Sequence, residues 1–163
     1  MTPEEHFEQY VVARRGALLR TAFLLTGDAH DAEDLVQRAL VKAVAKWPRL
    51  MDRPEPYVRR IIYRENISRW RRRTVGEHLV AEPPEGRVEE DHDSRLAVRA
   101  ALLRLTPKQR TVLVLRFYED LTEAQTAEAL GIGLGTVKSQ TRHALKRLRE
   151  LAPDLVELKT PTH

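Results

Sequence analysis

Hydrophobic residues recur along the chain every three or four positions, the spacing of amphipathic helices, and no stretch of useful length alternates as a strand would. In the first half of the chain, hydroxyl or acidic caps, glycine and proline mark the ends of three helices. These helices are expected over residues 2–26, 28–47 and 55–73, and a proline-rich, turn-forming connector, 48–56, leads into the third. The pattern predicts an all-α fold.

The composition changes after the third helix. Residues 74–93 include few apolar side chains that could be buried, and Pro83-Pro84 breaks any helix. The segment contains seven acidic residues and one arginine. Such a segment buries too little apolar surface to fold alone, so we expect a flexible acidic linker. Helical spacing resumes at Ser94. The chain is therefore predicted to form two small helical domains, 1–73 and 94–152, with a short tail over 153–163.

The segment Thr122–Glu150 fits a helix-turn-helix. Ala127 lets two helices approach closely, Gly131 relieves the turn, and Val137 fills the angle between the helices. Thr136 is expected to cap the second helix of this motif, where its hydroxyl and backbone N–H could hold a phosphate. That helix has five cations and no acid before Glu150, which a purely structural hairpin does not require. The pattern favours a helix that enters the DNA major groove. The candidate duplex contacts are Thr136, Lys138, Ser139, Gln140, Arg142, His143 and Lys146.

The third helix combines arginine with aromatic residues. Between Arg53 and Arg73 there are eight arginines and two acids, with Tyr57, Tyr63 and Trp70 interleaved. Arginine forks onto phosphates and stacks on bases, and aromatic rings suit bases that have left the duplex stack. A solvated helix face with Trp70 in the core explains the same residues equally well. A second basic helix elsewhere in the chain favours the interpretation as a surface for opened DNA.

The second helix begins with a polar face. Asp31, Asp34 and Gln37 lie at i, i+3 and i+6, which places them on one side of a helix. Acids in a first turn complement the helix dipole by about 0.3–1 kcal/mol per charge. Dipole complementation accounts for the acids but not for the shared face. Both that account and a docking face for a protein partner stay open on the residues alone.

Composition argues against several other classes of protein. The 163-residue chain has no cysteine, which excludes disulfides and thiolate metal sites and favours the cytoplasm. Its first residues are polar and acidic, and no apolar run approaches the roughly 20 residues of a bilayer span, so membrane insertion is not expected. Six histidines lack ligand spacing, and the glycine run 131–135 follows no strand. We expect no metal, no cofactor and no enzymatic activity.

Three segments, in this order, resemble the extracytoplasmic-function (ECF) group of the sigma-70 family of RNA polymerase sigma factors. They read TGDAHDAEDLVQRAL, PEPYVRRIIYRENISRWRRR and LTPKQRTVLVLRFYEDLTEAQTAEALGIGLGTVKSQTRHALKRLRE. The resemblance covers roughly residues 5–150 and looks most like the actinobacterial SigE-like subgroup. It implies a protein that binds the RNA polymerase core and directs promoter-specific transcription initiation.

The resemblance also implies a function for each segment. Domain 1–73 would be sigma region 2, with Asp31, Asp34 and Gln37 on the β′ clamp helices of core polymerase. The same domain would open and read the −10 element. Domain 94–152 would be region 4. Its basic helix, which is expected to begin at Thr136, would read the −35 duplex, while another face of the domain would bind the β flap. The linker would thread through polymerase channels, and an anti-sigma factor is a further partner that the resemblance allows. The −10 contacts would be Arg53, Tyr57, Arg60, Tyr63, Arg64, Trp70 and Arg71.

Two of these segments depart from the usual pattern of the group. Asparagine is usual where this chain has Arg64, and whether Arg64 contacts a base or a phosphate stays open. VKSQTRHA stands where many members have VKSRLSRA, so Gln140 and His143 replace arginines and a different −35 preference is expected.

The alternative function is a free-standing helix-turn-helix regulator. A pure interaction protein is a third class, and neither alternative needs two DNA-facing helices.

Overall fold

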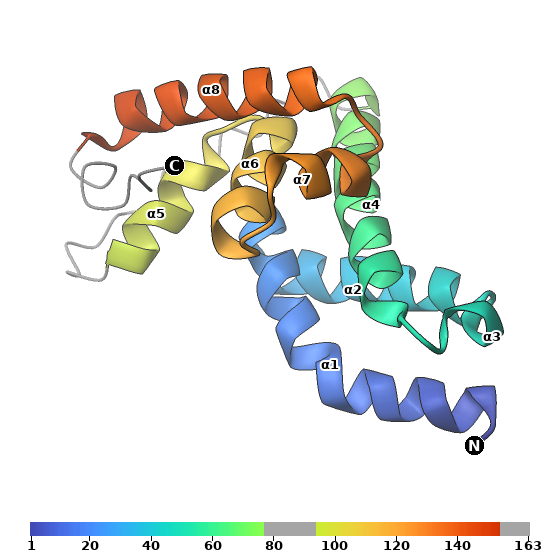
Figure 1. Cartoon of the computed structure of the whole chain (residues 1–163). Helices are drawn as coiled ribbons and strands as arrows, with labels where there is room; N and C mark the ends of the chain where they lie inside the picture. The colour runs from blue at the N-terminus through green and yellow to red at the C-terminus, as the bar shows by residue number, and fades with distance from the viewer. Residues whose placement is uncertain (77–93, 154–163) are drawn as a thin grey trace. The chain divides into compact units, whose positions relative to one another are not determined.

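The computed structural model describes the backbone of residues 1–76 and 94–153 and the side chains of residues 1–69 and 96–153. Within these residues all regular structure is helical, as Figure 1 shows, which confirms the predicted all-α fold. The chain divides into two compact units, Met1–Arg69 and Trp70–His163. The division falls inside one long helix, and the predicted domain limits, 1–73 and 94–152, stay predictions.

The first unit contains α1 (Pro3–Thr26), α2 (Ala29–Val44), α3 (Trp47–Leu50) and the first part of α4 (Pro54–Gly76). Thr2 and Glu5 form a reciprocal capping box at the start of α1, and Gly27 ends the helix with φ 74°. A left-handed residue at this position favours glycine because it has no Cβ. Asp28 then caps α2 by accepting a hydrogen bond from the Asp31 N–H at 2.9 Å. These caps set the short turn through which α2 packs back along α1.

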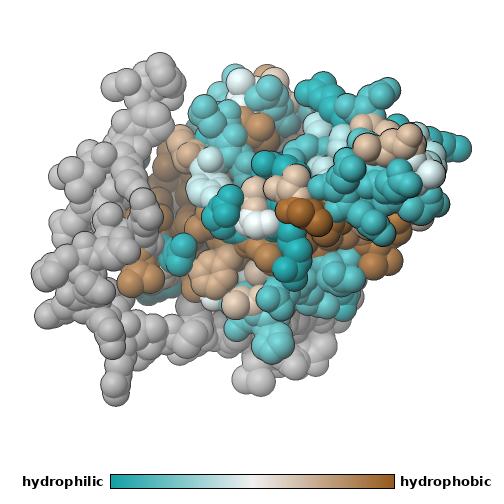
Figure 2. Space-filling view, turned by 90° about the horizontal axis from the view of Figure 1, so that it is seen from below, coloured by the Kyte–Doolittle hydropathy of each residue, from teal (hydrophilic) through white to brown (hydrophobic). Residues whose placement is uncertain are grey.

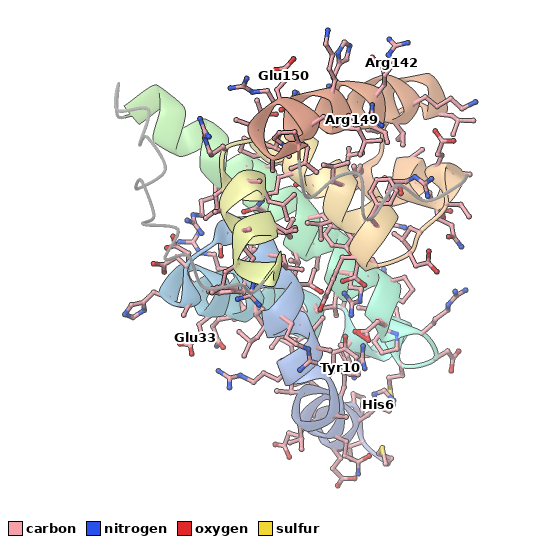
Figure 3. All side chains as sticks on the ribbon, turned by 90° about the vertical axis from the view of Figure 1, so that its left-hand side faces the viewer. His6, Tyr10, Glu33, Arg142, Arg149 and Glu150 are labelled. Carbon is pink, nitrogen blue, oxygen red and sulfur yellow. The ribbon has the colours of Figure 1, made fainter. Side chains whose placement is uncertain are left out.

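Trp47 joins the start of the first unit to α3. Its side chain is 1% exposed, with the rings of His6, Phe7 and Tyr10 at centroid distances of 5.7, 4.9 and 5.0 Å. The Trp47 Nε1–H donates to His6 Nδ1 at 2.9 Å, so the indole nitrogen is satisfied inside the cluster. Figure 3 shows His6 and Tyr10 on the same stretch of α1. The cluster fixes the chain just before α4 begins.

Two helix boundaries differ from the sequence prediction. The second helix was expected to reach Trp47, but α2 ends at Val44 and Trp47 begins the separate helix α3 inside the predicted connector. Pro48 explains this, because it has no N–H for the Val44 carbonyl and its ring would clash there. At the other end, α4 continues to Gly76, three residues into the predicted linker. The rest of that linker, 77–93, and residues 154–163 of the tail lie outside the described residues.

The second unit contains α5 (Ser94–Leu103), α6 (Pro107–Leu113), the wide π turn η1 (Val114–Tyr118), α7 (Glu123–Leu130) and α8 (Leu134–Leu151). Capping boxes of threonine and glutamine begin both α6 and α7. In Figure 1, α8 runs along α5, α6 and α7, and it packs against all three. The buried residues of this core are Leu102, Leu105, Leu113 and Ala144, with Val98, Leu145, Leu148 and Leu151 partly buried against them.

The π turn leaves two aromatic residues of this unit on the surface. Phe117 and Tyr118 are 40% and 50% exposed. The Glu119 N–H donates to the Val114 carbonyl at 2.9 Å, a five-residue step that adds a residue to the turn. The extra residue shifts the phase of the helix, so side chains that an α-helix would bury turn outward. Asp120 follows with φ 57°, the single non-glycine residue with positive φ in the described chain.

The surface contains both polar and apolar residues. Figure 2 shows hydrophilic and hydrophobic residues interspersed over the face in view. Among the described residues, the large apolar side chains that are most exposed are Met1, Val12, Val41, Val44, Leu96, Phe117, Tyr118, Ile132 and Leu134. Val44, the last residue of α2, is 44% exposed. None of the described helices has both the length and the apolar character that a bilayer span requires.

Candidate nucleic-acid interface

The α7–turn–α8 segment has the sterics that the sequence predicted. Gly131 adopts φ 68° and ψ 35°, and the N–H of Ile132 donates back to the Ala127 carbonyl at 3.1 Å. Ala127 and Val137 are both buried, so the small residue and the apolar plug lie where the two helices meet. These contacts fix the angle at which α8 leaves the turn. The predicted helix-turn-helix geometry is therefore confirmed.

The start of α8 differs from the prediction. Thr136 was expected to be the N-cap, but α8 begins at Leu134 and its N-cap is Gly133, which makes no side-chain cap. Gly133 is extended, with φ −72° and ψ 154°, and its carbonyl accepts from the Val137 N–H at 3.1 Å. A glycine can adopt this cap at little cost, so the cap lies three residues before Thr136. The N–H groups of Leu134, Gly135 and Thr136 then have no partner within the helix, which is the arrangement that suits a phosphate.

The predicted duplex contacts all lie along α8 and all remain accessible. Lys138, Arg142, His143 and Lys146 are exposed, as is Thr136, whereas Ser139 and Gln140 are half-buried. Figure 3 shows Arg142 extending away from the helix. Arg147 pairs with Glu150 at 3.2 Å near the end of α8, beyond these residues. The first three turns of α8 therefore present cations and polar groups without a neighbouring acid on the same helix.

The two acids of α4 are both bound to other helices. Glu55 accepts from the Tyr10 hydroxyl at 3.1 Å and from the Arg14 Nε–H at 2.7 Å, and it lies 3.6 Å from the Nε of Arg59. Glu65 pairs with Lys42 of α2. Burial, followed by the nearby Glu55 carboxylate, raises the pKa of the Tyr10 hydroxyl well above its usual value. Both acids of α4 are therefore engaged by residues of α1 and α2.

The predicted −10 contacts, on α4 and directly before it, do not share one environment. Arg53, which precedes the helix, and Arg64 are exposed, and Tyr57 and Arg60 are half-buried. Tyr63 is 1% exposed, so the structure does not place it on the surface where a base could stack. It lies one residue after the buried Ile62, on the side of α4 that faces the core. The side chains of the last two predicted contacts, Trp70 and Arg71, lie outside the described residues.

The three predicted polymerase contacts on α2 differ in their partners. The Asp31 carboxylate is held by Arg69 of α4 at 2.7 Å, which makes it an interhelical tie. Asp34 is exposed and pairs with Arg38 at 3.0 Å on its own helix, and Gln37 is also exposed. Asp34 and Gln37 therefore remain available to a partner, whereas Asp31 connects α2 to α4. Val41, one turn after Gln37, extends this exposed face, although it was not among the contacts predicted from the sequence.

Family comparisons match both units of the chain. Sigma-70 region 2 matches residues 11–75, and sigma-70 region 4 matches residues 101–150. The RNA polymerase sigma-E factor of Streptomyces avermitilis is 41% identical over 149 residues, covering 88% of this chain and 83% of the relative. The ECF RNA polymerase sigma factor SigL of Mycobacterium tuberculosis is 34% identical over 142 residues, covering 81% of this chain and 80% of the relative.

A solved structure has a similar fold. The sigma factor RpoE of Bartonella quintana, crystallised in complex with the anti-sigma factor NepR, matches with a TM-score of 0.67 and 28% identity. The match covers 91% of this chain and 97% of that one. Two matched regions, close relatives of nearly the same extent and a shared fold agree with the helix-turn-helix and the arginine-rich helix described above. The chain therefore belongs to the sigma-70 family of RNA polymerase sigma factors, among its ECF members.

Proposed function

We propose that this sigma factor divides promoter recognition between its two units, with α8 on the −35 duplex and α4 on the opened −10 element. A sigma factor directs RNA polymerase to promoters. Because this chain belongs to the sigma-70 family, it has that general function. The observation that supports the division is that each unit has one basic helix with an accessible side, and that Glu55, Glu65 and Glu150, the described acids on these helices, are each paired with a cation.

The second unit supplies the duplex reader. The free N–H groups at the start of α8 bind one phosphate, which sets the depth and register of the helix in the major groove. Lys138, Gln140 and Arg142 then reach base edges in the first turns. Lys146 lies further along the helix and contacts phosphate. Gln140 and Arg142 distinguish the sequence that this protein prefers, since amide and guanidinium groups read adenine and guanine respectively.

The first unit supplies the surface for opened DNA. Arg53, directly before α4, and Arg64 on the helix are exposed cations that attract the backbone of the separated strand, and Tyr57 offers a ring for a base. Arg60 is half-buried beside them and takes a phosphate. Tyr63 is a core residue in this proposal because its side chain is buried. The proposed region is therefore smaller than the one that the sequence predicted.

Core polymerase binds the exposed face of α2. Asp34 and Gln37 supply the polar contacts to the β′ clamp helices, and the β flap binds the second unit on a face other than the DNA-reading side of α8. An anti-sigma factor is a further proposed partner, because the similar Bartonella quintana protein was crystallised with one. The protein performs no chemistry of its own in this proposal, and it acts in the cytoplasm, where its polymerase transcribes.

Transcription with core polymerase tests the function directly. The full chain is mixed with core enzyme that lacks sigma, and initiation is mapped on a library of promoter-length duplexes. The expected result is initiation at sites that share two spaced elements, with weak binding of the isolated protein to the same DNA. No promoter-dependent initiation, together with tight dimeric binding to bare duplex, would show that the protein is a free-standing regulator.

Charge reversal tests the docking face. Asp34→Lys is expected to weaken core binding at least several-fold, since its exposed carboxylate faces the proposed partner. The control is Glu8→Lys, which makes the same charge change at an exposed position on α1. Asp31 is unsuitable for this test because its reversal would break the ion pair with Arg69 and disturb α4. Equal core affinity of the two variants would show that Asp34 does not bind the polymerase, and that the acids of α2 only complement the helix dipole.

A further inference from the structure

An apolar side chain lies in line with the cations of α8. Leu134, the first residue of the helix, is 45% exposed, and Lys138 and Arg142 follow it at four-residue steps. Each such step turns the side chain by only about 40° around the helix axis, so the three form one ridge. Lys138 and Arg142 are both exposed along it. The ridge therefore presents a leucine, a lysine and an arginine in sequence from the tip of the helix.

The tip of α8 leaves room for close approach. A Cβ added at Gly135 would have no neighbour within 4 Å, and one added at Gly133 would meet only the Thr136 hydroxyl at 3.9 Å. Leu134 therefore stands between two residues without side chains, and nearly half of its own surface is exposed. The buried residues of this helix, Val137 and Ala144, lie on another side of it. The exposed part of Leu134 is therefore available to a molecule that approaches the tip of α8.

Only one base offers an apolar group in the major groove. The edges of guanine, cytosine and adenine present hydrogen-bond donors and acceptors, whereas thymine also presents its 5-methyl group. The first residues of a recognition helix are the ones that approach base edges. An exposed leucine there would meet a desolvated polar edge at every base pair except those with thymine. The chemistry of the position therefore favours the thymine methyl.

We propose that Leu134 contacts the 5-methyl group of one thymine in the duplex element that α8 reads, next to the base pairs contacted by Lys138 and Arg142. This inference rests on the proposed function of α8 and adds a specificity residue that reads shape and apolarity instead of hydrogen bonds. Removing the methyl is expected to weaken binding about fourfold, the value of one buried methyl-sized group. The effect is small, but it is confined to a single position.

Deoxyuridine substitution isolates this contact because it removes only the methyl group of thymine. The preferred duplex is first selected with the holoenzyme formed from the full chain and core polymerase. Each thymine in the −35 element is then replaced singly by deoxyuridine, and the affinity of holoenzyme is measured. The wild-type protein is expected to lose about fourfold at one thymine. Leu134→Ala is expected to lose a similar factor on the thymine duplex and to be insensitive to deoxyuridine at that position.

Matched variants make the result specific. Ile132→Ala removes the other exposed apolar residue near the turn and should keep the wild-type sensitivity to deoxyuridine. Leu134→Ala should fold normally, because the residue is exposed and alanine is the better helix former. If Leu134→Ala retains the sensitivity, or if no thymine responds in the wild type, the inference is wrong.

The same measurements separate this inference from the proposed function. A holoenzyme with a clear −35 preference that Arg142→Ala alters, but without any response to deoxyuridine, would overturn only the contact made by Leu134. A holoenzyme with no preference among duplexes at this element would overturn both. A loss of core affinity in Leu134→Ala, with unchanged deoxyuridine sensitivity, would show that the leucine binds polymerase and not DNA.

Discussion

Replacing Glu55 by alanine is expected to loosen α4 from α1, because this carboxylate is the point at which the two helices are tied. It accepts from the Tyr10 hydroxyl at 3.1 Å and from Arg14 at 2.7 Å, and it lies near Arg59. Arg59 in turn donates to the Thr21 hydroxyl of α1 at 3.1 Å. The substitution therefore removes the centre of a polar network that spans more than 40 residues of sequence.

The magnitude follows from the exposure of each partner. The Arg14 side chain is 41% exposed, so its ion pair contributes at most about 1 kcal/mol after solvent screening. The hydrogen bond from the partly buried Tyr10 to a charged acceptor contributes about 1.5 kcal/mol, the lower end of the range for such bonds. Arg59, at i+4 on the same helix, adds about 0.3–0.5 kcal/mol. Glu55→Ala should therefore cost roughly 2–3 kcal/mol.

Tryptophan fluorescence provides the assay. The chain has two tryptophans, so in a Trp70→Phe background Trp47 is the only one, and its ring lies 5.0 Å from that of Tyr10. Urea unfolding of this background with and without Glu55→Ala gives the change in the free energy of unfolding. Glu55→Gln should fall between the two, because an amide oxygen can still accept from Tyr10 but forms no ion pair.

The control and the refuting result use a second glutamate of the same unit. Glu33 is an exposed residue of α2, and Figure 3 shows it extending away from that helix. Glu33→Ala is expected to change the unfolding free energy by less than about 0.5 kcal/mol. If Glu55→Ala is no more costly than this control, the network contributes nothing to the position of α4. The account of how α1 holds the start of α4 would then be wrong.

Four further outcomes are expected. Because the pKa of Tyr10 is raised in the folded protein, the unfolded chain loses this proton first, so stability should fall as the pH rises above about 10; Tyr10→Phe should lessen the fall in urea titrations. Asp120→Gly should be roughly 0.5–1 kcal/mol more stable than Asp120→Ala by thermal unfolding, since only glycine tolerates φ 57° freely. Gly131→Ala should cost about 1 kcal/mol in the same measurement, because its φ of 68° is left-handed. Arg110→Met should cost about 1–3 kcal/mol, because the buried guanidinium donates to two carbonyls near the end of α5 that would lose their partner.

The helix-turn-helix could be predicted from the sequence because its constraints are local and steric. A left-handed turn position requires glycine, and Gly131 has that conformation. Close approach of two helices requires a small residue, and Ala127 is buried at that point. An apolar plug is needed six residues after the turn glycine, and Val137 is fully buried there. Each requirement involves residues within six positions of Gly131, so no tertiary knowledge was needed.

Features that depend on helix phase could not be predicted. The cap of α8 was assigned to Thr136 because hydroxyl residues favour caps, yet Gly133 competes for the same function and begins the helix earlier. Phe117 and Tyr118 continue the apolar spacing of α6, and a single wide turn leaves both of them exposed. Periodicity within a sequence does not reveal where an extra residue enters a turn.

Within the candidate site, the sequence could identify the residue types but not their partners. Tyr63 belongs to an arginine–aromatic helix by pattern, and only the packing of α4 shows that it is buried while Arg64 is exposed. Asp31 and Asp34 are equivalent on a helical wheel, but Arg69 binds the first and leaves the second to its own helix. Such differences arise from residues nearly 40 positions apart, which local spacing does not encode.

The placement of acids explains how a chain with a formal net charge of only +4 can present two cationic helices. Glu55 and Glu65 are held by residues of α1 and α2, and the first acid on α8 is Glu150, which pairs with Arg147. Attraction to a phosphate decays over about 8 Å at physiological salt, so the charge near each helix matters more than the total. Removing Glu65 would therefore leave Lys42 without its ion pair and make the charge beside Arg64 more positive, whereas a new acid beside Arg142 is expected to weaken duplex binding. Local sorting of charge, not the net charge of the chain, is what makes both helices suitable for DNA.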